Sequence, residues 1–239
     1  MWNSRLVKSM FVLLVLGSWL YAQAPNSLPN PYRPVENWAK LPAGIEWGQV
    51  ISVEPDAKEN IWVFHRSDPA ILEFDQTGKL LKSFATGMFV QAHGLFVDRE
   101  GNVWVTDAQG KPGKGHQVFK FSPEGKVLMT LGKAGVTGTG PDTFNSPSDV
   151  VVGNNSDIFV ADGHGENTNA RIVKFSKDGK FIKAWGKKGS GPSEFDTPHS
   201  MTDPLRRLSV RVQRPTTFTG PVAREHCFTN IGKVVHILW

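Results

Sequence analysis

The sequence of 239 residues predicts an all-β fold of the β-propeller type. One segment recurs three times, at a spacing of roughly forty to fifty-five residues that is typical of blades and solenoid arrays. Within each copy, short runs alternate between apolar and polar residues, as strands do. No copy has apolar residues at helical spacing, which argues against leucine-rich and helical solenoids. Repetition, alternation and the lack of a helical period together predict blades of antiparallel strands.

The repeat is visible directly in the residues. Its three copies read NIWVFHRSDPAILEFDQTGKLLKSF, NVWVTDAQGKPGKGHQVFKFSPEGKVLMTLGK and DIFVADGHGENTNARIVKFSKDGKFIKAWGK. A fourth copy begins at Thr197-Pro198-His199-Ser200-Met201 and does not continue in the same pattern. The chain is therefore expected to form about three blades and the start of a fourth.

Each copy is expected to contribute four strands, which run from the inner to the outer edge of a blade. Gly78, Gly125 and Gly179 lie between the third and fourth runs and supply the positive φ that tight hairpins need. The expected strands cover residues 48–53, 61–64, 71–74 and 80–84, then 93–97, 103–106, 118–121 and 127–131, then 148–152, 158–161, 172–175 and 181–185.

The first residues have the pattern of a secretory signal. Arg5 and Lys8 precede an apolar run over 10–20, which is too short to span a bilayer, and Ala22-Gln23-Ala24 offers small residues for cleavage. Residues 1–24 are predicted to be a signal peptide and the protein to be secreted or periplasmic, with no stable membrane span after cleavage. An uncleaved anchor is the alternative.

Charge and cysteine content narrow the class of protein further. The net charge is +5, but residues 25–200 hold 19 basic and 20 acidic residues, so the repeat region is close to neutral. This distribution argues against a nucleic-acid partner. Cys227 is the only cysteine, so an exported protein of this kind has no internal disulfide framework.

The repeat motifs resemble those of a known family. An opening Pro-x-x-Val/Leu strand, a Phe/Trp-Val-x-Asp strand, Arg-Ile-Val-Lys-Phe and Asp-Gly-Lys resemble the NHL-repeat β-propellers. Within them, residues 40–200 look most like the bacterial relatives of the peptidyl-α-hydroxyglycine α-amidating lyases. Because such propellers usually have six blades, the resemblance implies that this chain forms an incomplete six-bladed ring.

The resemblance also divides the chain into regions. Residues 25–44 form an N-terminal lead-in, and residues 45–201 form the blades. Residues 202–239 differ from the repeats in charge and composition, so we predict a divergent, out-of-register tail in a truncated or frame-shifted chain. A genuine but divergent fourth blade is the alternative.

Two histidines occupy the same register of different repeat units. His93 in Gln91-Ala92-His93-Gly94-Leu95 and His199 in Thr197-Pro198-His199-Ser200-Met201 both lie where an inner strand begins. Imidazoles that converge from separate blades are suitable zinc ligands. On the residues alone, histidines at strand ends are more often surface or hydrogen-bonding residues than metal ligands.

By resemblance, the amidating lyases bind zinc through three histidines from different blades, and His93 and His199 match two of them. A third ligand is expected beyond residue 201 without an evident match, since His226 and His236 lie in unmatched sequence. The predicted zinc site is therefore incomplete. The resemblance also implies structural calcium.

Two further residues are candidates for catalysis. Arg66 aligns with the family's substrate-binding arginine, and a pairing with Asp68 is the alternative. His164 stands where the lyases carry a tyrosine proposed as base; a histidine there could transfer a proton or join a metal site. The segment 165–169 that follows is expected to be a polar loop.

These features leave two functions open. The first is a lyase that cleaves the N–Cα bond of a C-terminal α-hydroxyglycine and releases a peptide amide and glyoxylate, as the resemblance implies. The second is a non-catalytic propeller that binds or scaffolds a peptide or small-molecule ligand at its central channel. A lactonase-like hydrolase would require a carboxylate-rich metal site, and the sequence shows none near His93 or His199.

Overall fold

The computed structural model describes residues 32–202, 208–213 and 234–237. The chain divides into two compact units, Met1–Asn37 and Trp38–Trp239, and all strands belong to the second. The predicted signal peptide lies outside the described residues, so it stays a prediction. Within the described ranges, no helix has the length and hydropathy needed to cross a bilayer.

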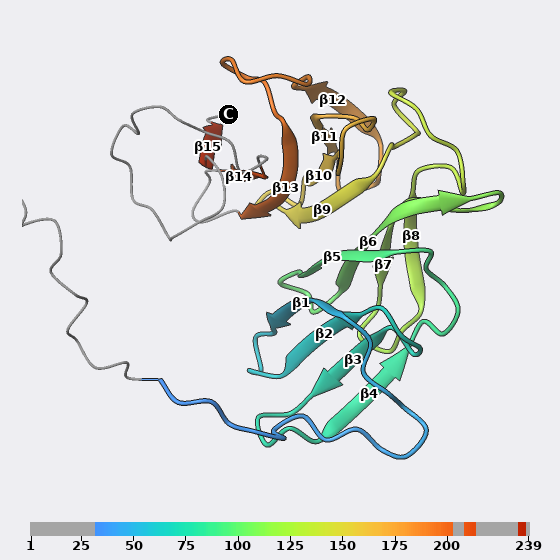
Figure 1. Ribbon diagram of the computed structural model, residues 1–239, viewed down its shortest axis with the longest axis vertical. Helices are drawn as coiled ribbons and strands as arrows, with labels where there is room; N and C mark the ends of the chain where they lie inside the picture. Colours follow the sequence, from blue (N-terminus) through green and yellow to red (C-terminus); the bar gives the residue numbers. More distant parts are fainter. Residues whose placement is uncertain (1–31, 203–207, 214–233, 238–239) are drawn as a thin grey trace, which may run out of the picture. The chain divides into compact units, whose positions relative to one another are not determined.

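The predicted all-β architecture is confirmed. Three four-stranded antiparallel sheets follow one another along the chain, each with its strands in sequence order (Figure 1). Their strands are β1 (Val50–Pro55), β2 (Ile61–His65), β3 (Ile71–Phe74) and β4 (Leu80–Phe84), then β5 (Ala92–Val97), β6 (Val103–Lys111), β7 (Lys114–Phe121) and β8 (Val127–Leu131), then β9 (Pro147–Val152), β10 (Ile158–Asp162), β11 (Arg171–Phe175) and β12 (Phe181–Trp185).

A fourth sheet holds three strands. It pairs β13 (Thr197–Thr202), the predicted start of a fourth blade, with β14 (Leu208–Gln213) and β15 (Val234–Ile237), which the repeat pattern does not predict. The remaining residues of the tail lie outside the described range. The first strands of the four sheets, β1, β5, β9 and β13, are neighbours in that order.

One hairpin is longer than the sequence pattern predicts. Strands β6 and β7 pair as far as Lys111 and Lys114, around a two-residue Pro112-Gly113 turn. Proline fixes its own φ, and Gly113 adopts a positive φ of 74°, so this dipeptide closes a tight turn between paired strands. The sequence analysis treated these residues as part of a connection.

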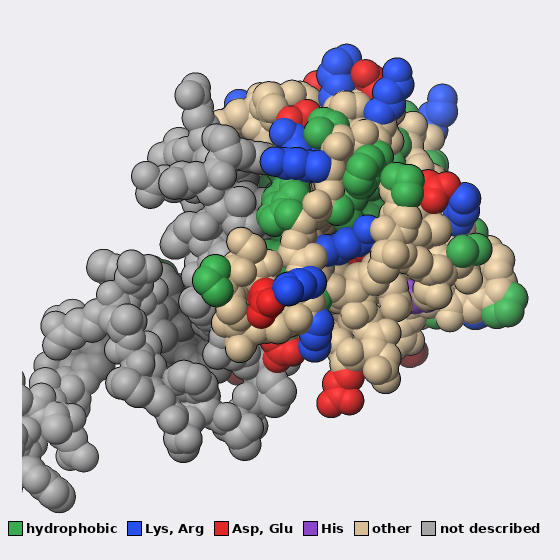
Figure 2. All heavy atoms as spheres, turned by 90° about the horizontal axis from the view of Figure 1, so that it is seen from above, with side chains coloured by type: hydrophobic (Ala, Val, Ile, Leu, Met, Phe, Trp, Pro, Cys, Tyr) green, Lys and Arg blue, Asp and Glu red, His purple; other side chains and the backbone are tan. Residues whose placement is uncertain are grey.

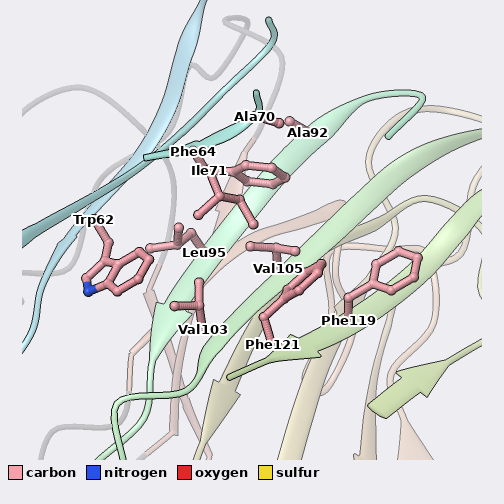
Figure 3. Close-up of a cluster of buried hydrophobic side chains, with 10 residues drawn as sticks. All are labelled: Trp62, Phe64, Ala70, Ile71, Ala92, Leu95, Val103, Val105, Phe119 and Phe121. Carbon is pink, nitrogen blue, oxygen red and sulfur yellow. The ribbon is translucent and has the colours of Figure 1, made fainter. Parts of the chain in front are cut away.

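The blades are held together by apolar wedges between neighbouring sheets. Figure 3 shows one of them, where Trp62, Phe64 and Ile71 of the first blade face Leu95 and Phe121 of the second. All five side chains are almost completely buried. Replacing such a phenylalanine by alanine typically costs about 3–5 kcal/mol, so these wedges fix how adjacent blades pack.

Buried tryptophans also recur with a polar partner. The indole Nε1 of Trp62 donates to Asp56 at 3.2 Å, and that of Trp104 donates to Asp98 at 2.9 Å. Both aspartates lie in the turn that precedes the tryptophan strand. The repeated hydrogen bond lets a tryptophan be fully buried in each of the first two blades without an unsatisfied N–H.

Several lysines of the turns and connections have acidic partners. Examples are Lys133 with Asp142 at 2.5 Å and Lys177 with Asp178 at 3.4 Å, both solvent-exposed pairs. Figure 2 shows basic and acidic side chains interspersed over the face that it views. This mixed surface agrees with the near-neutral balance of the repeat region, and the lack of a nucleic-acid partner stays a prediction.

Candidate metal centre

Three histidines from three blades meet at the ends of the inner strands. His93 lies on β5, His199 lies on β13, and His164 follows β10 in the loop that leads to β11. The ring centroids are separated by 4.5 Å for His93 and His164, 5.1 Å for His93 and His199, and 4.9 Å for His164 and His199. Their ligand nitrogens all lie within 4.8 Å of one another, so the group could bind a metal ion.

Irregular pairing helps to aim two of these side chains. In each inner strand the ladder to the next strand skips a residue near the start, which forms a β-bulge. Bulges bend a strand and redirect the side chains that they contain. The ladder skips Ile51 in β1, Ser148 in β9 and His199 in β13, and in β5 it skips both His93 and Gly94, opposite Thr106 of β6.

The neighbouring blade orients the His93 ring. The ring is buried, and its Nδ1 lies 2.7 Å from the backbone oxygen of Ser148. A carbonyl oxygen only accepts, so Nδ1 carries the proton and Nε2 keeps its lone pair. This arrangement is typical of metal-binding histidines, whose second ring nitrogen donates to a backbone or carboxylate oxygen. His93 is therefore prepared to bind a metal through Nε2.

Burial keeps two of the three imidazoles neutral. The pKa of His93 is lowered to about 4, first by burial and then by charge repulsion from His164, His199 and Arg66, while its hydrogen bond to Ser148 opposes the shift. The pKa of His164 is lowered as well, mainly by burial and also by Arg66. Near pH 7 both rings are neutral, and only a neutral imidazole has a ring nitrogen with a lone pair free for a metal.

Ser148 links the strands that carry the two matched histidines. Its carbonyl accepts from His93, and its hydroxyl donates to the backbone oxygen of Pro198, next to His199, at 2.5 Å. Ser148 is completely buried. Ser148 lies at the bulge of β9, at the position that His93 occupies in β5 and His199 occupies in β13. This shared position in the repeat is the sequence signal that could have identified Ser148.

His164 is presented by a loop that depends on glycine. Gly163 and Gly165 on either side of it adopt φ angles of 141° and 137°. A Cβ on Gly163 would lie 1.6 Å from the backbone oxygen of Asn169, so no larger residue fits there without movement. The backbone N–H of Gly163 donates to Ser146 at 2.9 Å, which fixes the start of the loop.

Arg66 lies at the same end of the blades, where its charge acts on His93 and His164. Its Nε donates to the backbone oxygen of Ala92 at 3.2 Å, and its Nη1 donates to Gln49 at 2.9 Å. The alternative pairing with Asp68 is not formed; that carboxylate accepts from the backbone N–H of Gly87 instead. Arg66 is solvent-exposed and available to an anionic ligand.

The structure thus brings together His93, His199 and, from the loop, His164. The sequence analysis assigned His164 to proton transfer or to the metal, and expected a third ligand beyond residue 201. His226 lies outside the described residues, and the side chain of His236 on β15 is not described. The expectation of a ligand beyond residue 201 therefore stays a prediction. Among the described residues, the three histidines are the one group of three or more potential ligands within reach of a single ion. The predicted structural calcium stays a prediction.

A buried carboxylate on β9 lies outside the group of three histidines. Asp149 on β9 accepts from the backbone N–H of Met201 at 2.7 Å and of Val150 at 2.9 Å. Burial raises its pKa to about 7, and Glu54 on β1 adds to this shift. Sequence reasoning did not single out either acid. The pKa of Glu54 is itself raised by burial.

Fold and site together define the class of this protein: a β-propeller in which neutral imidazoles from separate blades converge at the inner strands and could bind a metal. No family model matches the chain. Individual proteins do match it.

The chain is 36% identical over 238 residues to the peptidyl-glycine α-amidating monooxygenase of Mus musculus, covering 80% of this chain and 24% of that protein. It is 34% identical to the peptidyl-α-hydroxyglycine α-amidating lyase 1 of Drosophila melanogaster, covering 80% of this chain and 40% of that protein. It is 33% identical over 235 residues to the NHL repeat-containing protein 3 of Homo sapiens, covering 91% of this chain and 67% of that protein.

A solved streptogramin B lyase structure has the same fold, with a TM-score of 0.51 at 19% identity, over 82% of this chain and 56% of that one. The chain belongs to the NHL-repeat propeller family and is related to the amidating lyases. This confirms the resemblance predicted from the motifs. The chain spans about a quarter of the length of the mouse relative and two thirds of the length of the human one.

Proposed function

We propose that this chain is a zinc-dependent lyase of the peptidyl-α-hydroxyglycine type. His93, His164 and His199 would hold the metal, and Arg66 would bind the carboxylate of the substrate. The observation that supports the proposal best is the convergence of three imidazoles, with ligand nitrogens within 4.8 Å of one another, in a relative of the amidating lyases. Nitrogen ligands of this number leave a position open on a tetrahedral metal.

The residues present fit the requirements of zinc. The Nε2 of His93 is left unprotonated by the hydrogen bond to Ser148, and burial keeps His93 and His164 neutral. Zinc, when bound, supplies a Lewis acid that polarises a hydroxyl or carbonyl oxygen. The chain itself supplies the donors and the buried surroundings.

The proposed reaction breaks the N–Cα bond of a C-terminal α-hydroxyglycine. A base removes the hydroxyl proton, the oxygen electrons form the C=O bond of glyoxylate, and the N–Cα electron pair leaves with the amide nitrogen, which takes up a proton. Arg66 would hold the substrate carboxylate with a fixed guanidinium, since Ala92 and Gln49 already fix two of its nitrogens. Such fixed positioning contributes to rate because the reacting groups need no further alignment.

His164 has two competing roles in this reaction. It matches the family position of the proposed base, and its ring lies 4.5 Å from that of His93, within the metal group. We propose the role of metal ligand. A His164→Tyr variant restores the tyrosine of the lyases: if His164 is a ligand, this variant loses zinc affinity, whereas a base would be replaced with zinc retained.

A binding or scaffolding propeller is the second candidate. Two observations favour it: the tyrosine of the lyases is absent, and the human NHL repeat-containing protein 3, whose name states no reaction, matches 91% of the chain. In this case the site would hold a peptide or small molecule at the inner strands without cleaving it.

Metal analysis and turnover on one purified protein decide between these functions. We expect about one zinc per chain, its loss in His93→Ala, and release of glyoxylate from a peptidyl-α-hydroxyglycine. His116→Asn is the matched control, because His116 lies outside the metal group and asparagine tolerates its positive φ of 54°. Zinc without glyoxylate would favour the binding propeller, and zinc that survives His93→Ala would overturn the metal site.

We also propose that the protein is exported, on the pattern of residues 1–24. Fractionation of expressing cells, with the N-terminus of the mature protein sequenced, tests this. An intact N-terminus in the cytosolic fraction would contradict it.

A further inference from the structure

The loop that carries His164 is closed by a buried ion pair. The Nε of Arg171, the first residue of β11, donates to Oδ2 of Asp162, the last residue of β10, at 2.8 Å. The Asp162 side chain is 0% exposed and that of Arg171 is 10% exposed. His164 lies two residues after the acid, so the pair stands at the base of its loop.

Arg171 also binds the neighbouring connection between β8 and β9. Its Nη2 donates to the backbone oxygen of Thr143 at 2.9 Å and that of Gly140 at 3.2 Å, and its Nη1 donates to that of Thr139. One guanidinium therefore joins the His164 loop to a second loop about thirty residues earlier. A planar guanidinium suits this role because its donors point in fixed directions.

Asn169 closes the other end of the loop. Its Nδ2 donates to Oδ2 of Asp162 at 2.7 Å and to the backbone oxygen of Gly138 at 2.8 Å. Together with the bond from Gly163 to Ser146, these contacts fix both ends of the short segment that contains His164. The segment has no strand partner of its own, so it is held by these side-chain contacts and by backbone bonds at its two ends.

The second blade shows that the ion pair is not a requirement of the repeat. At the equivalent position, Asp107 on β6 faces Gln117 on β7, and no ion pair forms there. Burying the second charge, the guanidinium of Arg171, adds a desolvation cost in blade three that the uncharged Gln117 avoids in blade two. The additional contacts of Arg171 occur in the blade whose loop brings a histidine to the metal group.

We propose that Asp162, Arg171 and Asn169 form a positioning device that holds His164 in reach of the metal. The inference rests on the proposed metal site. None of the three touches the ion; each acts through the backbone that carries His164. Contacts of this kind typically change metal affinity about 10–100-fold when they are lost.

Cobalt(II) titration of the metal-free full chain, followed by visible absorption, measures the affinity. We expect Arg171→Gln to weaken cobalt binding by about tenfold or more. Lys174→Gln is the matched control. Lys174 on β11 pairs at 2.6 Å with Asp157, which directly precedes β10, at the end of these strands remote from His164. We expect it to leave cobalt affinity within about twofold.

A double-mutant cycle separates positioning from general destabilisation. In a His164→Ala background, Arg171→Gln should no longer change cobalt affinity, because its effect passes through His164. An equal loss of affinity in both backgrounds, or no loss in either, would overturn the inference. If Arg171→Gln does not fold, Asn169→Ala replaces it, since this variant removes one bridge and leaves the ion pair intact.

The same titration distinguishes this inference from the proposed function. If His93→Ala and His199→Ala leave cobalt affinity unchanged, the metal site itself is wrong and the positioning inference fails with it. If both abolish binding and Arg171→Gln does not weaken it, only the positioning inference fails.

Discussion

The second and third blades use one repeat position in two ways. Asp107 and Asp162 occur at the same point of the repeat, and each accepts backbone N–H groups from the segment before the inner strand of its own blade. After Asp107 the chain continues as a paired hairpin, whereas after Asp162 it leaves the sheet and carries His164. Both aspartates therefore stabilise the segment that leads into the inner strand.

The difference shows how a repeat can acquire a site without losing its fold. In blade two, ladder pairs such as Gly110 with Gly115 hold the extended hairpin through the backbone. In blade three, that backbone pairing is replaced by the side chains of Arg171 and Asn169. Side-chain contacts allow a loop of irregular shape, and an irregular loop can aim an imidazole where a regular hairpin cannot.

Removal of each aspartate gives the largest contrast between the blades. Asp162→Ala leaves the buried guanidinium of Arg171 without its counter-charge, so we expect a loss of about 3–5 kcal/mol in the free energy of unfolding. Asp107→Ala leaves only backbone N–H groups without an acceptor, so we expect a smaller loss in the free energy of unfolding, about 1–3 kcal/mol. Urea unfolding followed by circular dichroism measures both. Equal losses of unfolding free energy in the two variants would contradict the distinction between Asp107 and Asp162.

Glycine substitutions test the two connections directly. Gly163→Ala would place a Cβ against the backbone of Asn169, so we expect a cost of about 2–3 kcal/mol and weakened metal binding. Gly113→Ala, at the tip of the blade-two hairpin, has nothing within 4 Å and a φ of 74°. Its cost should be about 1 kcal/mol, with metal affinity unchanged. Thermal melts and cobalt titration provide the measurements.

Asp149 is a third buried carboxylate to compare with Asp107 and Asp162, and it has no cationic partner among the described residues. Its titration makes a prediction about the pH dependence of stability. Asp149 has its pKa raised to about 7 in the folded state, above its ordinary value of 3.8. The folded chain holds this proton more tightly than the unfolded chain, so the contribution of Asp149 to stability is complete below pH 3.8 and is lost as pH rises towards 7. The slope cannot exceed about 1.4 kcal/mol per pH unit for one group.

Asp149→Asn removes this titration, so the free energy of unfolding of the metal-free variant should depend less on pH between about 4 and 7. The charge of Glu54 contributes to the raised pKa of Asp149, and burial raises the pKa of Glu54 as well, so Glu54→Gln is the companion measurement. Denaturant titrations at several pH values provide the data. An unchanged slope in Asp149→Asn would show that this carboxyl is already ionised in the folded state.

The strands were predictable because their signals are local. Alternation and the glycine turns predicted twelve strands in the first three blades, and the structure places a strand over each of them. The register of His93 and His199 was visible because it recurs within the repeat. By contrast, the proximity of His164 depends on the course of an irregular loop, and Arg171 binds residues about thirty positions away. Such contacts leave no periodic pattern in a single sequence.

The smallest expected effect concerns Ser148. This residue of blade three contacts both β5, which carries His93, and β13, which carries His199. Ser148→Ala removes the hydroxyl bond to Pro198 and keeps the backbone oxygen that orients His93. We expect a cost of about 1 kcal/mol for the carbonyl left without its donor. Cobalt affinity should fall by less than after Arg171→Gln, because β13 stays paired with β14 and keeps His199 in register. A larger fall in cobalt affinity would mean that the hydroxyl of Ser148, rather than the contacts of Arg171 with the His164 loop, controls how the imidazoles converge.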